Sequence, residues 1–312
     1  MGSLAQQPVS LSGYDFNLGD AELGAILQQI QDGQFARLRE YLARTRADAD
    51  WQDRIFVLEQ LTPYIPLRAL DEACSAEPDA VDLQVIRCAF YGGLAGKSRG
   101  TGTANQVSRE RFQNSAECVK AAMNAMARST HLDDKDPTAH TLVIRPLTIF
   151  GETEMQQKAF ARATAIAPDL VPAHFGLISA LSKRWGGSHE TCLAFARQAL
   201  SKAAQGSDMA ACLFWAHSLV RTHLLHFDKD PQAAKQYAAK PDVIAELNAA
   251  LDNWLAPSYT PRRSSIQYLK KATEWYAAAV DIDRLQRVAA FTGEEFKVKK
   301  SGGLLGWLFG GK

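Results

Sequence analysis

The chain has 312 residues, enough for one large domain or two small ones, and 46% of them are hydrophobic, which is ample for a core. Lys plus Arg (35) nearly balance Asp plus Glu (34), which argues against a nucleic-acid binder, and no run approaches the ~18 apolar residues of a membrane span. Five cysteines without Cys-x-x-Cys spacing indicate reduced, mostly buried thiols. Because a signal-peptide pattern is also missing, we expect a cytoplasmic protein.

Apolar residues recur at helical spacing along most of the chain, which predicts an all-α fold. Residues 1–18 are polar and are predicted to be a flexible N-terminus. The predicted helices cover about 23–30, 35–42, 55–61, 67–74, 83–90, 108–131, 213–224, 244–254, 266–276 and a last segment ending near residue 291, besides those of the central repeat. In total we expect twelve to fourteen helices.

Residues 92–108 contain five glycines and two basic residues, and they predict a Gly-rich loop. The pattern Gly100-x-Gly102-x-x-Asn105 lacks the third glycine and the preceding strand of a dinucleotide-binding loop. Arg99 could instead hold an anion near the start of the next helix. A purely structural or mobile loop is the interpretation that we favour.

An internal repeat follows, with an offset of 34 residues. Ala-x-Ala-Arg-x-Thr at 125–130 and Ala-His at 139–140 recur at 159–164 and 173–174, and Ala-Phe-Ala-Arg returns at 194–197. A 34-residue helix–turn–helix unit has the tetratricopeptide period. We therefore predict an α-solenoid, a tetratricopeptide-like helical array, with such units over about 108–226 of a single domain spanning 19–296.

The stretch 182–197 predicts a corner between two helices. Gly186 and Gly187 supply backbone freedom, and Ser188 is a good N-cap for the next helix. Arg184 and Trp185 either lock this corner structurally, which local interlocking favours, or form a recognition surface, since both residue types are enriched in interface hot spots.

Three stretches also support a family resemblance: Arg-Gly-Thr-Gly at 99–102 with the Val-Ser-x-Glu-x-Phe that follows at 107–112, Asp-Pro at 136–137, and Lys-Arg-Trp-Gly-Gly-Ser-His-Glu at 183–190. Through them, residues 99–197 resemble a bacterial family catalogued as domain of unknown function four-zero-three-four. The resemblance implies tetratricopeptide-like helices and no assigned activity.

A metal site and a catalytic cysteine are two further candidates, and for both we favour a structural interpretation. His223 and His226 share a helix face, but neither a His-Glu-x-x-His motif nor a cysteine pair accompanies them, so we predict no metal site. Cys192 and His189 are three residues apart and could make a nucleophile pair, although a buried, inert thiol is the expectation. We predict no catalytic residue and no cofactor.

Residues 297–312 form a Gly/hydrophobic C-terminal tail with lysines around it. It is too short to span a bilayer, but it could dock on a membrane surface, enter a partner groove or cap the last helices.

These patterns predict a non-catalytic protein- or peptide-binding protein of the adaptor, assembly-factor or toxin-neutralising type. Arg99, Arg184, Trp185 and His189 are the candidate binding residues. The alternative is a hydrolase or transferase whose site lies between the Arg99 loop and the Trp185 corner, with Arg99, Arg184 and His189 converging. A weaker alternative is peripheral membrane attachment through the tail.

Overall fold

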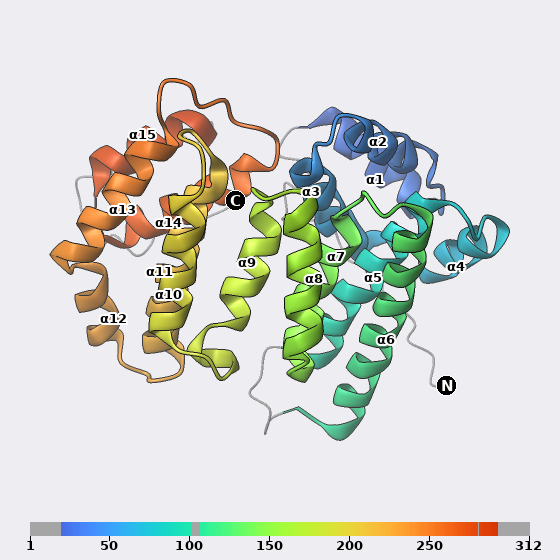
Figure 1. Ribbon diagram of the computed structural model, residues 1–312, viewed down its shortest axis with the longest axis horizontal. Helices are drawn as coiled ribbons and strands as arrows, with labels where there is room; N and C mark the ends of the chain where they lie inside the picture. Colours follow the sequence, from blue (N-terminus) through green and yellow to red (C-terminus); the bar gives the residue numbers. More distant parts are fainter. Residues whose placement is uncertain (1–19, 101–106, 280, 293–312) are drawn as a thin grey trace.

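The computed structural model describes residues 20–100, 107–279 and 281–292, and over these ranges the chain forms fifteen α-helices and no strand (Figure 1). The predicted all-α class is confirmed. The first five helices are α1 (Ala21–Gln31), α2 (Ala36–Ala47), α3 (Trp51–Leu61), α4 (Leu67–Ala76) and α5 (Val81–Arg99). The next five are α6 (Arg109–Leu132), α7 (Thr138–Phe150), α8 (Thr153–Ile166), α9 (Val171–Ala180) and α10 (His189–Ser201). The last five are α11 (Ala211–His226), α12 (Pro231–Ala238), α13 (Pro241–Trp254), α14 (Ser265–Ala279) and α15 (Ile282–Thr292).

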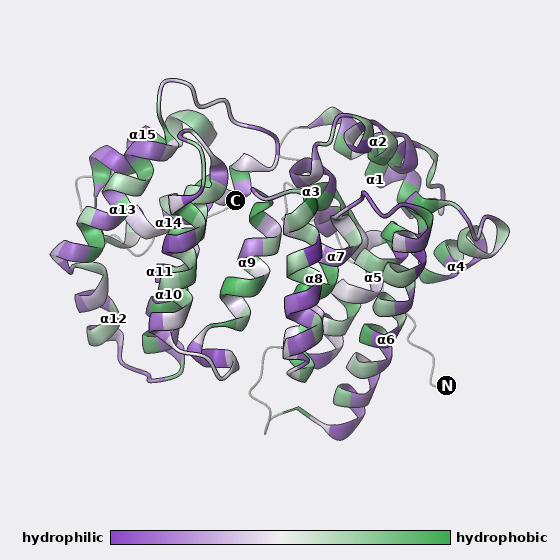
Figure 2. Ribbon diagram, in the orientation of Figure 1, coloured by the Kyte–Doolittle hydropathy of each residue, from purple (hydrophilic) through white to green (hydrophobic). Residues whose placement is uncertain are grey.

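Alternate helices pack against one another from α5 onward. Helix α5 contacts α6 and α7, α7 contacts α8 and α9, α9 contacts α10 and α11, and α11 contacts α12 and α14. In Figure 1, α8, α9 and α10 stand side by side, in agreement with these contacts. Figure 2 shows hydrophobic and hydrophilic residues alternating around α6, α8 and α10, as expected of helices that bury one face.

The residues that recur at 34-residue spacing occupy matching places. Small alanines are buried where α6 meets α7 and where α8 meets α9: Ala125, Ala139, Ala159 and Ala173. Arg128 on α6 pairs with Asp79, in the turn before α5, and Arg162 on α8 donates to the Asp134 carbonyl, in the turn before α7, over 2.9 Å. The third arginine, Arg197 on α10, departs from this pattern because it reaches forward to Glu246 on α13.

An arginine hub joins α3, α5 and α7 in the interior. The Arg54 side chain is fully buried and donates to Asp82 over 2.7 Å, to Asp136 over 3.0 Å and to the Thr138 hydroxyl over 3.2 Å. It also donates to the Leu42 carbonyl. Every guanidinium nitrogen therefore has an acceptor, and a buried charge is stable only with such compensation.

The segment before α14 contacts the first helices of the chain. Arg263 contacts Asp20 and Glu22, and the Ser264 amide donates to Asp53 over 2.7 Å. Figure 1 shows this segment beside α3. The contact sets the N-terminal helices against the C-terminal half.

Two expectations need correction. The predicted loop 92–108 is helical up to Arg99, because α5 continues through its glycines, of which Gly92 faces α7: a Cβ there would lie 3.4 Å from the Leu142 carbonyl oxygen. The helix number is fifteen rather than twelve to fourteen, partly because α12 was missed. The predicted flexible N-terminus (1–18), residues 101–106 of the predicted loop and the predicted Gly/hydrophobic tail (297–312) lie outside the described residues.

Candidate functional site

The predicted corner between α9 and α10 is present. Lys183–Trp185 form one 3₁₀ turn, and Gly186 has a left-handed φ of +89°. A Cβ on Gly187 would lie 2.0 Å from the Leu181 carbonyl oxygen, so only glycine fits there. The Ser188 hydroxyl accepts from the Thr191 amide over 3.1 Å and begins α10. The Gly-Gly-Ser sequence thus fixes the turn between Trp185 and the start of α10.

Two arginines contact the Trp185 ring. The Arg99 guanidinium, at the end of α5, lies 5.1 Å from the ring centre, and that of Arg184 lies 5.3 Å away. Arg99 is buried, and the pKa of its side chain is lowered by desolvation first and by repulsion from Arg184 second. Arg184 is exposed and also lies 5.5 Å from the centre of the Phe227 ring. The guanidinium groups of Arg99 and Arg184, which are far apart in the sequence, therefore contact the same indole ring.

His189 joins the same cluster through α11. Its ring centre is 5.2 Å from that of His223, and the His223 ring stacks on Phe227 with centres 5.0 Å apart. We call Arg99, Arg184, Trp185, His189, His223 and Phe227 the corner cluster. All four predicted binding residues belong to it.

Burial disfavours the charged form of both histidines. The pKa of His189 is lowered mainly by desolvation and further by His223 and Lys183, while Glu190 and Asp228 oppose the shift. The pKa of His223 is also lowered by desolvation, and Asp228 opposes. Both imidazoles are therefore neutral at pH 7.

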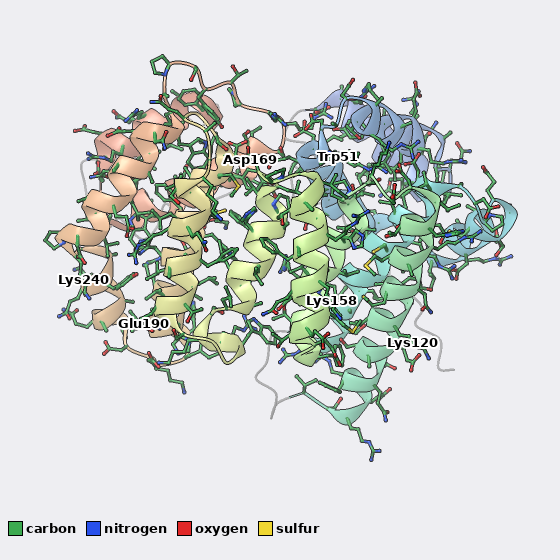
Figure 3. The ribbon with its side chains drawn as sticks, in the orientation of Figure 1. Trp51, Lys120, Lys158, Asp169, Glu190 and Lys240 are labelled. Carbon is green, nitrogen blue, oxygen red and sulfur yellow. The ribbon has the colours of Figure 1, made fainter. Side chains whose placement is uncertain are left out.

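An open groove of about 660 Å³ begins at His189 and lies between α10, α11 and α12. Its lining is His189, Glu190, Leu193, Ala194, Arg197, Val220, Leu224, Ala233, Gln236, Tyr237 and Lys240. Figure 3 shows Glu190 near the start of α10 and Lys240 at the junction of α12 and α13. The groove thus has an apolar floor and polar groups along both sides.

A hydrogen-bonded network includes Arg197 and Tyr237 of the groove lining. Arg197 donates twice to Glu246, over 2.6 and 2.9 Å, and this lowers the pKa of the Glu246 carboxyl. His217 lies 3.1 Å from the same carboxylate and 2.7 Å from the Tyr237 hydroxyl. Arg197, which departs from the repeat pattern, therefore joins α10 to α13 next to the groove.

The predicted burial of Cys192 is confirmed. Cys192 is buried, its Sγ lies 3.5 Å from the Ile178 carbonyl oxygen, and burial raises its pKa to about 12. At pH 7 such a thiol is protonated and is a poor nucleophile. In the described part of the chain, no three His, Cys, Asp or Glu side chains converge on a metal position, and no helix there is long and apolar enough to cross a membrane.

Sequence reasoning missed Phe227, Tyr237 and the wall made by α12. The pair Asp230-Pro231 is typical of a turn, but an N-cap followed by proline is also a helix start, and the Asp230 side chain does accept from the Ala233 amide over 2.8 Å. That signal could have predicted α12. The pairing of His223 with His189 across two helices had no signal, because it depends on tertiary packing.

No protein-family model, curated protein or solved structure matches this chain. The resemblance to the uncharacterised bacterial family and the tetratricopeptide-like arrangement therefore stay predictions.

Proposed function

We propose that the chain is a non-catalytic, cytoplasmic helical-repeat protein that binds a protein or peptide in the groove between α10, α11 and α12. The succession of contacts from α5 to α7, α9, α11 and α14 supports a tetratricopeptide-like solenoid. Such stacks bury a continuous core and leave an extended surface for partners.

The observation that carries the proposal is the groove itself. Leu193, Val220 and Leu224 form an apolar floor, and the corner cluster adjoins it through His189. An apolar floor with a polar rim is the usual anatomy of a peptide-binding surface. Arg184 and Trp185 at its end are residue types that dominate binding energy. A partner would place apolar side chains on the floor and a polar or anionic group near the corner.

Site-specific photo-crosslinking in the native host tests the groove directly. A photoreactive amino acid replaces Ala194, which is exposed in the groove, and a matched control replaces Met155, which is 40% exposed on α8. We expect one abundant crosslinked partner from position 194 and none from position 155. The same adduct from both positions, or none from position 194, contradicts the proposal.

The variant Arg184→Ala with Trp185→Ala sharpens this experiment. Circular dichroism first establishes that the variant is folded. We expect the yield of the position-194 crosslink to fall at least tenfold, because two hot-spot side chains are lost. An unchanged yield would place the partner elsewhere on the molecule.

A second candidate is an enzyme that acts on an anionic substrate at the corner cluster. The approach of Arg99 and Arg184 to one indole ring favours it, since two guanidinium groups there could hold an anion; His189 is joined to them only through His223 and Phe227. Its test is turnover of a phosphate or carboxylate ester library, with loss of activity in His189→Gln.

Membrane attachment through residues 301–312 is a third candidate, and it requires that liposome binding be lost when these residues are removed.

A further inference from the structure

We infer that His189 and His223 form a binding site for a divalent transition-metal ion of the zinc class. The inference begins from two nitrogens: Nε2 of His189 and Nδ1 of His223 are both buried, and neither has a hydrogen-bond partner. Buried polar atoms are seldom left in this state, because each loses its hydration without compensation. Two such atoms on neighbouring rings point to a shared ligand.

The spacing of the rings fits a shared metal ion. Their centres are 5.2 Å apart and their planes are inclined by 78°. Two imidazoles on one tetrahedral zinc ion have ring centres roughly 5 Å apart, because the ion lies about 2 Å from each nitrogen. The observed separation of the ring centres therefore matches that of two histidines on one ion.

Asp228 supplies the orienting contact that metal-binding histidines usually have. Its Oδ1 lies 3.5 Å from Nε2 of His223, on the nitrogen that the metal would not use. A carboxylate there favours the tautomer with the proton on Nε2 and leaves the Nδ1 lone pair free. Asp228 is thus a positioning residue in this site.

The charges around the pair are balanced. Lys183 acts on both histidines and disfavours a cation, but its ammonium group also lies 4.0 Å from Asp228 Oδ1. Glu190 and Asp228 contribute negative charge next to His189. Since no third protein ligand converges in the described residues, water completes the coordination. The inference does not depend on the groove holding a partner.

The test uses the full chain, without a histidine tag, titrated with zinc chloride at pH 7.5 in a calorimeter. We expect saturable binding of one ion per chain at micromolar concentration. His189→Gln and His223→Gln each weaken it at least tenfold, and Asp228→Asn weakens it about tenfold or more. His226→Gln is the control, because His226 is exposed on the same helix. Absence of saturable binding below millimolar zinc, or equal loss in the control, overturns the inference.

Nuclear magnetic resonance of ¹⁵N-labelled histidine in the unmutated protein removes any dependence on variant folding. Zinc shifts the imidazole nitrogens of its ligands strongly. We expect two of the seven histidines to shift, and the single variants to identify them as His189 and His223. Shifts confined to other histidines overturn the inference.

Discussion

The arginine hub and the corner cluster both gather arginine side chains from distant helices, but they stabilise them differently. At the hub, Arg54 is enclosed by two carboxylates, a hydroxyl and a carbonyl. At the corner, Arg99 and Arg184 lie against an aromatic ring, and Arg99 also donates to the Gly100 carbonyl. The hub satisfies its polar groups internally, which is typical of a structural role. At the corner, Nε2 of His189 and Nδ1 of His223 retain hydrogen-bonding capacity, which is typical of a site that binds something.

The largest expected effect is at the hub. Arg54→Met leaves Asp82 and Asp136 buried without their cation, and we expect a loss of about 3–5 kcal/mol in the free energy of unfolding, measured in urea. The control is Arg128→Ala, which removes the more exposed pair with Asp79 and should cost less than about 1 kcal/mol. A small effect of Arg54→Met would mean that the hub is not the structural centre that its contacts indicate.

The backbone of the corner should be the next most sensitive point. Gly187→Ala places a methyl group against the Leu181 carbonyl, and we expect a destabilisation of roughly 1–3 kcal/mol from the enforced shift. Gly186→Asn is the matched control, because asparagine tolerates a left-handed φ and the space there is open. Equal thermal stabilities of the two variants would contradict the close approach at Gly187.

The histidines of the corner should also make the stability of the protein depend on pH. The folded-state pKa values of His189 and His223 are lowered, so the unfolded chain binds more protons, and stability is lost as the pH falls below about 6.5, the unfolded histidine pKa. Urea titrations at successive pH values measure how the free energy of unfolding changes with pH. His223→Gln should make the free energy of unfolding less dependent on pH, and His226→Gln should not; an equal dependence in both variants would assign the effect to other buried histidines with lowered pKa values, namely His140, His174 and His217.

Helical periodicity and the Gly-Gly-Ser break predicted the all-α class and the corner because both depend on local chemistry. The glycines of α5 misled the prediction, since they lie within a helix and not in a turn, and Gly92 there faces α7. Arg99, Arg184 and Trp185 do meet, whereas His189 reaches them only through His223 and Phe227, and these contacts depend on how α10 packs on α11. Contacts of this kind have no sequence signature, because residues 34 apart are brought together only by the fold.

The smallest effect decides between the two interpretations of Trp185. A double-mutant cycle of Arg184→Ala and Trp185→Ala measures their coupling in the free protein, and we expect about 0.5–1 kcal/mol, as for an exposed cation–π contact. A coupling above about 2 kcal/mol would indicate that the pair locks the corner, as the arginine hub locks α3, α5 and α7. A weak coupling in the free protein, together with a large loss of crosslinking at position 194, would mean that the pair contributes its energy when the partner is bound.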